Sequence, residues 1–183
     1  MLVDISDDFD LEKIRNSGQC FRVRSFDDGL YRFITGCHVL YIKEVDTHRY
    51  WVSCAKHEWL EIWYDYLDLH RSYSDIANKE KGKHSFVDDA IAFGRGLRIL
   101  KQDPWEMLIT FIVSQRKSIP AISKAIEELS MKYGQEITTD VEKLYIFPTV
   151  KEMKKASYSE LSACGFGYRT RYIVDAINQV NSN

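Results

Sequence analysis

Apolar positions alternate with polar ones through the first third of the chain. Residues 8–17 first place apolar side chains at helical spacing behind acidic residues, and Gly18 follows as a stop. From residue 19 to residue 54 the apolar positions alternate, with many Tyr, Phe, Ile and Val residues, and Asp28-Gly29 is typical of a hairpin turn. The pattern therefore predicts a short helix and then an antiparallel meander of four or five strands.

Helical spacing replaces this alternation from residue 57 onward. Trp59, Trp63 and Tyr66 share one stripe of the first helical segment. Farther along, Asp103-Pro104 is typical of a helix start, and Gly134 of a helix end. Further helices are predicted over 85–93, 104–115, 119–133, 149–156, 157–164 and 169–180.

A small sheet followed by an array of helices indicates an α+β fold. We expect an N-terminal antiparallel sheet domain with flanking helices over residues 1–84. A partial helical domain is expected over residues 85–183. The last helix is amphipathic, and the side chains expected to face inward are Tyr172, Ile173, Ala176, Ile177 and Val180.

Composition and charge exclude some classes of protein. A hydrophobic content of 45% and a net charge of −2 fit a folded globular protein and exclude a uniformly basic DNA-binding protein. Before residue 100 there are 14 basic and 17 acidic residues, and after it 11 and 10. Any nucleic-acid surface must therefore come from where the charges lie.

The sequence shows no pattern typical of a cofactor site, a secretory signal or a membrane-spanning segment. Cys20, Cys37, Cys54 and Cys164 have neither C-x-x-C spacing nor a His at metal-ligand distance, so we expect reduced thiols, no metal and no cofactor. The acidic first residues lack the features of a secretory signal, and no apolar run is long enough to span a membrane. We therefore expect a cytoplasmic protein without a membrane partner, associated with the nucleoid if its source is bacterial.

The segment G-F-G-Y-R-T-R-Y, residues 165–172, combines glycines, aromatic residues and arginines. Glycines permit a tight turn that presents an aromatic ring beside arginine, which is one way to enter stacked bases while holding phosphate. In the alternative interpretation Gly165 ends one helix, Arg169 begins the next, and the rings pack inside.

Three segments together suggest a family. They are S-G-Q-C-F-R (17–22), I-L-K-Q-D-P-W-E-M-L-I-T-F-I-V-S-Q (99–115) and C-G-F-G-Y-R-T-R-Y (164–172). In this order and spacing they resemble the 8-oxoguanine DNA glycosylases of the helix-hairpin-helix superfamily, from about Phe9 to the last residue. The resemblance implies an N-terminal sheet like the half-repeat of TATA-binding protein, and then a helical domain. It also implies base excision repair, with double-stranded DNA containing an oxidised or damaged purine as the partner.

The resemblance implies roles for individual residues. Gly18 matches the glycine whose backbone carbonyl faces the lesion, because 8-oxoguanine has an N7–H donor where guanine has an acceptor; otherwise Gly18 is only a helix stop. Tyr168 matches the aromatic residue that fills the gap left by the extruded nucleotide, and Arg169 the neighbour that reaches the estranged cytosine.

The α-helical junction at residues 115–122, Q-R-K-S-I-P-A-I, departs from the family pattern. Arg116 and Lys117 stand where better-known members carry asparagines, and Ala121 stands where they carry an arginine. We expect Arg116 and Lys117 to bind DNA, since arginine can donate a fork of hydrogen bonds to base or phosphate. The alternative is a solvated Arg–Lys pair.

The catalytic elements of the family lie beyond the matched segments. They are a glycine-rich hairpin, a lysine that attacks C1′ of the sugar, and an aspartate that stabilises the developing charge. Residues 173–183 contain no glycine-rich hairpin and no lysine, so no catalytic residue is assigned and the chain is expected to be inactive by itself. Lys124 and Lys154 are interpreted as exposed helix charges.

Three interpretations follow. The chain is the lesion-recognition and DNA-binding part of a glycosylase, or a non-catalytic module that binds DNA or protein, or a half-enzyme completed by a separate chain. Without further helices, an apolar face should also be partly uncovered, and self-association or a rearranged C-terminal helix should cover it. The candidates for that face are Ile109, Phe111, Ile112, Ile173 and Ile177.

Overall fold

The computed structural model describes residues 1–181 of the 183-residue chain. Its contacts divide the chain into two compact units. The first comprises Met1–Phe33 and Val39–Lys101, and the second comprises Ile34–His38 and the chain from Gln102 onward. A domain boundary was expected between residues 84 and 85, whereas the division by contacts assigns residues 85–101 to the first unit.

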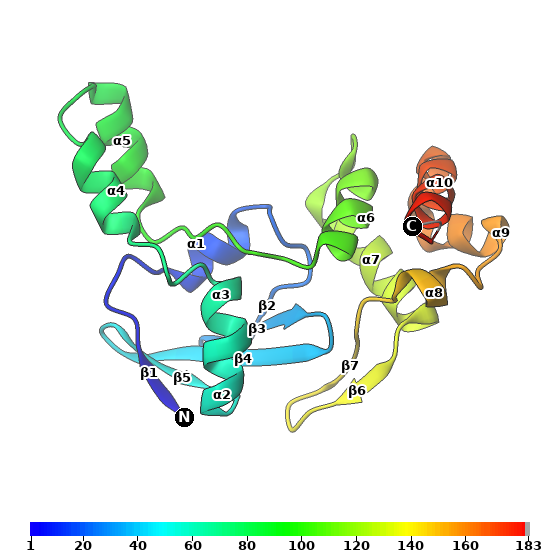
Figure 1. Cartoon of the computed structure of the whole chain (residues 1–183), viewed down its shortest axis with the longest axis horizontal. Coiled ribbons are helices and arrows are strands. Elements are labelled where there is room, and N and C mark those ends of the chain that lie inside the picture. The colour runs from blue at the N-terminus through cyan, green and yellow to red at the C-terminus, as the bar shows by residue number, and fades with distance from the viewer. Residues whose placement is uncertain (182–183) are drawn as a thin grey trace. The chain divides into compact units, whose positions relative to one another are not determined.

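A five-stranded antiparallel sheet forms the centre of the first unit, with strand order β1-β5-β4-β3-β2 (Figure 1). The predicted meander is confirmed, and β1 adds an edge strand that the sequence analysis missed, pairing Leu2 with Trp51. The strands are β1 (Leu2–Asp4), β2 (Arg24–Ser25), β3 (Leu30–Thr35), β4 (His38–Asp46) and β5 (Arg49–Val52).

Helices accompany this sheet. Asp10 caps the first of them by accepting a hydrogen bond from the Lys13 amide at 3.0 Å. Trp59, Trp63 and Tyr66 are buried in the core, so the predicted apolar stripe is confirmed. The helical segments are α1 (Leu11–Asn16), α2 (Lys56–Glu58), the π-helical η1 (Trp59–Trp63), α3 (Tyr64–Tyr66), α4 (Tyr73–Glu80) and α5 (Ser85–Gly94).

The second unit is mainly helical. Asp103 begins its first helix, because its carboxylate accepts a hydrogen bond from the Glu106 amide at 2.8 Å. Thr149 and Ser157 each form a capping box at the start of a short helix. The elements are α6 (Pro104–Ser114), α7 (Ile119–Tyr133), β6 (Glu136–Thr138), β7 (Lys143–Tyr145), α8 (Val150–Met153), α9 (Tyr158–Leu161), η2 (Ser162–Phe166), η3 (Gly167–Arg169) and α10 (Thr170–Asn181).

Close packing fixes the end of α7 against the β6–β7 hairpin. A Cβ atom at Gly134 would lie 1.9 Å from the Ile146 carbonyl oxygen, so only glycine fits there. Helix α10 packs against α6 and α8, and Ile109, Ile173 and Ile177 are buried. Within residues 1–181, no helix is both long and apolar enough to cross a membrane.

Candidate DNA interface

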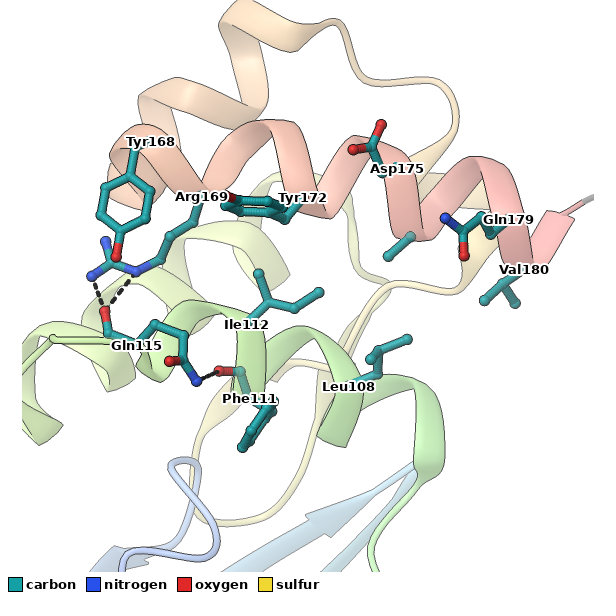
Figure 2. Close-up of a pocket in the computed structure, with 11 residues that line it drawn as sticks. Leu108, Phe111, Ile112, Gln115, Tyr168, Arg169, Tyr172, Asp175, Gln179 and Val180 are labelled. Carbon is teal, nitrogen blue, oxygen red and sulfur yellow. Dashed lines mark hydrogen bonds between the residues drawn. The ribbon is translucent and has the colours of Figure 1, made fainter.

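The loop between α9 and α10 is a tight turn whose backbone conformation depends on two glycines. Gly165 has a φ of 79° and Gly167 a φ of 59°, in the left-handed region that favours glycine. The turn buries Phe166 completely, whereas Tyr168 is 56% exposed (Figure 2). One aromatic ring of the loop therefore packs inside, and the next one lies at the surface.

Two cations tie this loop to the α6–α7 junction. The Lys117 ammonium donates a hydrogen bond to the Gly165 carbonyl at 2.6 Å. In the opposite direction, the Arg169 guanidinium donates through Nε to the Gln115 carbonyl at 2.8 Å and through Nη2 to the same oxygen (Figure 2). Its Nη1 donates to the Phe166 carbonyl at 3.3 Å. Both cations were expected to bind DNA, and in the structure both hold the loop.

Arg169 in the loop and Arg171 in the first turn of α10 each stack on a neighbouring tyrosine. Arg169 Cζ lies 4.5 Å from the centroid of the Tyr168 ring. Arg171 Cζ lies at the same distance, 4.5 Å, from the Tyr172 ring, and its Nη2 donates to the Tyr172 hydroxyl. Arg171 is exposed, so this second pair presents a cation and an aromatic ring to solvent. Arg171 was expected only to bring positive charge to the segment and Tyr172 to face inward, so the exposed pair was not predicted, although the repeated Arg and Tyr residues of the motif were a usable signal.

Arg116 lies exposed at the α6–α7 junction, where its φ of 51° reverses the chain in the left-handed region. The reversal follows the last turn of α6, where helix carbonyls have no partner within the helix. Lys117 is less exposed. Burial lowers the pKa of its ammonium, and the nearby positive charge of Arg169 lowers it further. The structure thus brings together Arg116, Lys117, Tyr168 and Arg169, the four second-unit residues of the predicted site.

A groove of about 630 Å³ lies between α6 and α10 beside this loop (Figure 2). A partly covered face was expected at Ile109, Phe111, Ile112, Ile173 and Ile177. This was wrong for Ile109, Ile173 and Ile177, which are buried, whereas Phe111 is exposed and lines the groove together with Ile112. The rearranged helix is not found within residues 1–181 either, since α10 forms one wall of the groove. The apolar and aromatic side chains that line the groove are Leu108, Phe111, Ile112, Tyr168, Tyr172, Ala176 and Val180.

Gly18, the remaining predicted site residue, belongs to the first unit. It follows α1 with a φ of 76°. The next side chain, Gln19, donates to the Arg98 carbonyl at 2.8 Å and accepts from the Leu100 amide at 2.8 Å. Gln19 therefore fixes the Gly18 turn to the segment that precedes α6. Sequence reasoning gave Gln19 no role, although it lies within S-G-Q-C-F-R.

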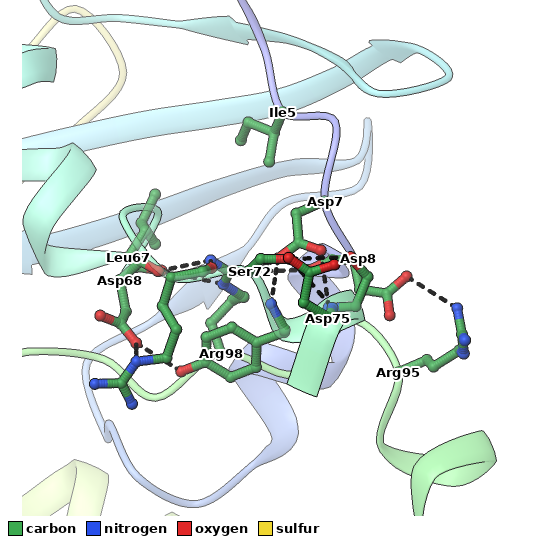
Figure 3. A network of polar contacts seen from close by, with 12 residues as sticks. Ile5, Asp7, Asp8, Leu67, Asp68, Ser72, Asp75, Arg95 and Arg98 are labelled. Atoms are coloured by element: carbon green, nitrogen blue, oxygen red, sulfur yellow. Dashed lines mark hydrogen bonds and ion pairs between the residues drawn. The ribbon is translucent and has the colours of Figure 1, made fainter. Parts of the chain in front are cut away.

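The segment that receives Gln19 is itself anchored by the fully buried Arg98 (Figure 3). The Arg98 guanidinium pairs with the Asp7 carboxylate at 2.7 Å. Asp7 also accepts hydrogen bonds from the amides of Tyr73 and Ser74 at the start of α4. The support under the Gly18 turn is therefore a buried polar network. Arg98 donates further to the main-chain carbonyls of Asp8, Leu67, Asp68 and Arg71.

The fold is that of a DNA glycosylase. The chain superimposes on the 8-oxoguanine glycosylase/lyase of Clostridium acetobutylicum in its apo-form with a TM-score of 0.93 and 30% identity, covering 99% of this chain and 63% of that one. The same protein in complex with dsDNA containing cytosine opposite to 8-oxoG gives a TM-score of 0.90 and 29% identity, covering 100% and 65%. These matches confirm the α+β fold.

Residues 2–108 match the family profile "8-oxoguanine DNA glycosylase, N-terminal domain", and the chain belongs to this family. It is 39% identical over 112 residues to the N-glycosylase/DNA lyase of Saccharomyces cerevisiae, which covers 58% of this chain and 30% of the yeast protein. It is 27% identical over 172 residues to the N-glycosylase/DNA lyase OGG1 of Arabidopsis thaliana, which covers 91% and 47%. The chain thus spans less than half the length of these two relatives.

Proposed function

We propose that this chain is the lesion-recognition and DNA-binding part of an 8-oxoguanine-type DNA N-glycosylase/lyase of base excision repair. Its proposed partner is double-stranded DNA that contains an oxidised or damaged purine. The proposed location is the cytoplasm, in association with the nucleoid if the source is bacterial. The Clostridium acetobutylicum protein that shares this fold binds dsDNA with cytosine opposite 8-oxoG, which supports the proposal. The observation that carries it is the exposed Tyr168 ring on a loop held in place by Lys117 and Arg169.

Tyr168 acts in this proposal as a replacement for a stacked base. An extruded nucleotide leaves a gap in the duplex, and an aromatic ring that enters the gap recovers stacking, worth about 1–3 kcal/mol per base. The exposed Arg116 and Arg171 neutralise phosphates on either side of the ring. Lys117 and Arg169 hold the loop before DNA arrives, and Arg169 lies against the Tyr168 ring that replaces the missing base.

Gly18 supplies the contact to the lesion. Its main-chain carbonyl accepts a hydrogen bond from the N7–H group that 8-oxoguanine has and guanine lacks. A backbone acceptor needs a fixed backbone, and the anchoring of Gln19 to Arg98 and Leu100 supports this role.

The groove between α6 and α10 is proposed as a contact surface for more protein. Phe111 is 66% exposed on one wall, and Tyr172 is 43% exposed on the other. Contiguous apolar surface of this kind is usually covered in solution. A second copy of this chain, or a chain that supplies further helices, is the proposed cover.

The wedge role of Tyr168 is tested with two duplexes of one sequence, of which one carries an abasic site. We expect Tyr168→Ala to bind the abasic duplex about tenfold more weakly, since about 1.4 kcal/mol of stacking is lost. Binding to the intact duplex should change little, and binding of either duplex should weaken as salt rises. Fluorescence anisotropy gives both affinities.

Tyr158→Ala is the matched control, because Tyr158 is also 56% exposed but lies in α9, outside the loop. This variant should bind both duplexes as the unaltered chain does. Equal losses on both duplexes for Tyr168→Ala would contradict the wedge role.

A further inference from the structure

We propose that Lys117 is a positioning residue that sets the Tyr168 ring for insertion into DNA. Lys117 and Arg169, with the carbonyls of Gly165 and Gln115, form what we call the cation latch. This inference rests on the proposed function, because it concerns how Tyr168 is held ready for the duplex.

In the cation latch, each of two segments donates a hydrogen bond to a main-chain carbonyl of the other. The α6–α7 junction supplies the Lys117 cation and the Gln115 carbonyl, and the loop supplies the Arg169 cation and the Gly165 carbonyl. Each segment therefore donates to the other and accepts from it. The two segments are thus joined at two points, so separating them breaks the hydrogen bonds of both Lys117 and Arg169.

Tyr168 lies between the two points that the cation latch fixes. Lys117 holds Gly165 three residues before the ring, and Arg169 follows the ring directly, with its guanidinium 4.5 Å from the ring centroid. Gly165 and Gly167 have no side chain to stiffen the turn, and both occupy positive φ. The hydrogen bond from Lys117 therefore restricts the backbone of the turn, which the flexible glycines do not restrict by themselves.

The position of Lys117 is unfavourable for a cation unless the hydrogen bond to Gly165 stabilises it. Lys117 gives up part of its hydration and lies near the like charge of Arg169, and both effects oppose its placement. The 2.6 Å hydrogen bond to the Gly165 carbonyl offsets them, because a charged donor forms a stronger bond than a neutral one. A lysine used only for phosphate has no need of such a position.

A phosphate-binding lysine and a positioning lysine predict different results on substitution. Loss of a phosphate contact weakens binding to every duplex and lowers the salt dependence. Loss of a positioning contact weakens only the complex that uses the Tyr168 ring. The ratio of affinities for abasic and intact duplexes therefore separates the two roles.

The test compares Lys117→Met with Lys124→Met on these two duplexes. Lys124 lies in α7 with a side chain that is 79% exposed, so its substitution removes the same charge without touching the loop. We expect Lys117→Met to lower affinity for the abasic duplex about tenfold, as for one hydrogen bond to a charged group. Lys124→Met should leave the ratio of the two affinities unchanged.

Lys117→Arg should restore the ratio, since guanidinium can also donate to the Gly165 carbonyl. Thermal unfolding of each variant shows whether the chain is folded, and if Lys117→Met is not, Lys117→Gln is read in the same way. Equal losses on both duplexes would make Lys117 a phosphate contact and overturn the proposal, as would no loss at all.

Tyr168→Ala, measured alongside, separates failure of this inference from failure of the proposed function. If Tyr168→Ala loses discrimination and Lys117→Met keeps it, only the cation latch is refuted. If Tyr168→Ala also keeps discrimination, the proposed wedge fails and the positioning role fails with it.

Discussion

Replacing Arg98 by methionine should destabilise the first unit more than any surface substitution nearby. The Arg98 side chain is fully buried and joins the N-terminal segment, the end of α3 and the start of α4. It also lies over the Tyr73 ring, with Cζ 4.0 Å from the centroid. Methionine retains the apolar stem but removes every donor of the guanidinium.

The size of the loss follows from the groups left behind. Asp7 keeps its hydrogen bonds from the Tyr73 and Ser74 amides at 2.6 and 3.0 Å, but it loses the cation at 2.7 Å. The Asp68 carbonyl loses a donor at 2.6 Å. Removing one partner of a buried ion pair costs about 3–5 kcal/mol. At about 4 kcal/mol, and roughly 2–4 °C per kcal/mol for a chain of this size, the Tm should fall by about 8–16 °C.

Thermal and urea unfolding followed by circular dichroism measure this loss. Arg95→Met is the matched control, because the Arg95 side chain is 45% exposed and its ion pair with Asp8 is long, at 3.4 Å. We expect that variant to lose at most about 1 kcal/mol. An Arg98→Met chain within about 1 kcal/mol of the unaltered chain would refute the reasoning, because the network would then contribute little.

The same network makes stability depend on pH. Burial by itself raises the pKa of Asp7, but hydrogen bonds from Ser74, Tyr73 and Arg98 outweigh burial and hold the pKa well below its usual range. Because the pKa is lower in the folded state, the contribution of Asp7 is complete above about pH 4 and is lost as the pH falls further. Arg98→Met should reduce this acid-induced loss, which urea unfolding at a series of pH values measures.

Two further predictions concern activity and association. Borohydride should not trap the 183-residue chain on abasic DNA, because no lysine in it follows a glycine-rich hairpin; a trapped adduct, seen by gel shift and peptide mapping, would point to one of its own lysines. Light scattering across a dilution series should show self-association through the groove between α6 and α10, which Phe111→Ser should weaken; a monomer at all concentrations would exclude a second copy as the cover.

The elements predicted best are those whose ends carry a chemical signal. Helix α7 spans Ile119–Tyr133 as predicted, because Ser118 and Pro120 mark its start and Gly134 its end. Three elements that were not predicted, α4, β6 and β7, lack a clear apolar pattern. Helix α4 has no buried residue, so its sequence has no apolar stripe from which the helix could be predicted. Strands β6 and β7 are three residues each, too short to show alternation.

The side chains of α10 show what periodicity leaves out. Ile173 and Ile177 face inward as predicted, although both side chains are buried and not partly covered as expected. Tyr172 and Val180 were also expected inside but are 43% and 42% exposed. The periodicity of apolar residues shows which face of the helix points inward. How many side chains of that face are buried depends on which neighbouring elements pack against it.

The candidate site shows a similar limit. The motif identified the loop and its residues, but the partners of Arg169 are the carbonyls of Gln115 and Phe166. Main-chain acceptors are the same in every residue type, so no sequence pattern could reveal them. For the same reason the 2.6 Å contact from Lys117 to Gly165 could not be predicted.

The cation latch also has a thermodynamic consequence. A flexible loop that orders only on binding loses conformational entropy at that moment, at about 1–2 kcal/mol for each residue whose backbone becomes fixed. Here the hydrogen bonds from Lys117 and Arg169 fix the turn while the protein folds. The entropy loss therefore belongs to folding, and the free energy gained from each later contact of the loop is available for affinity.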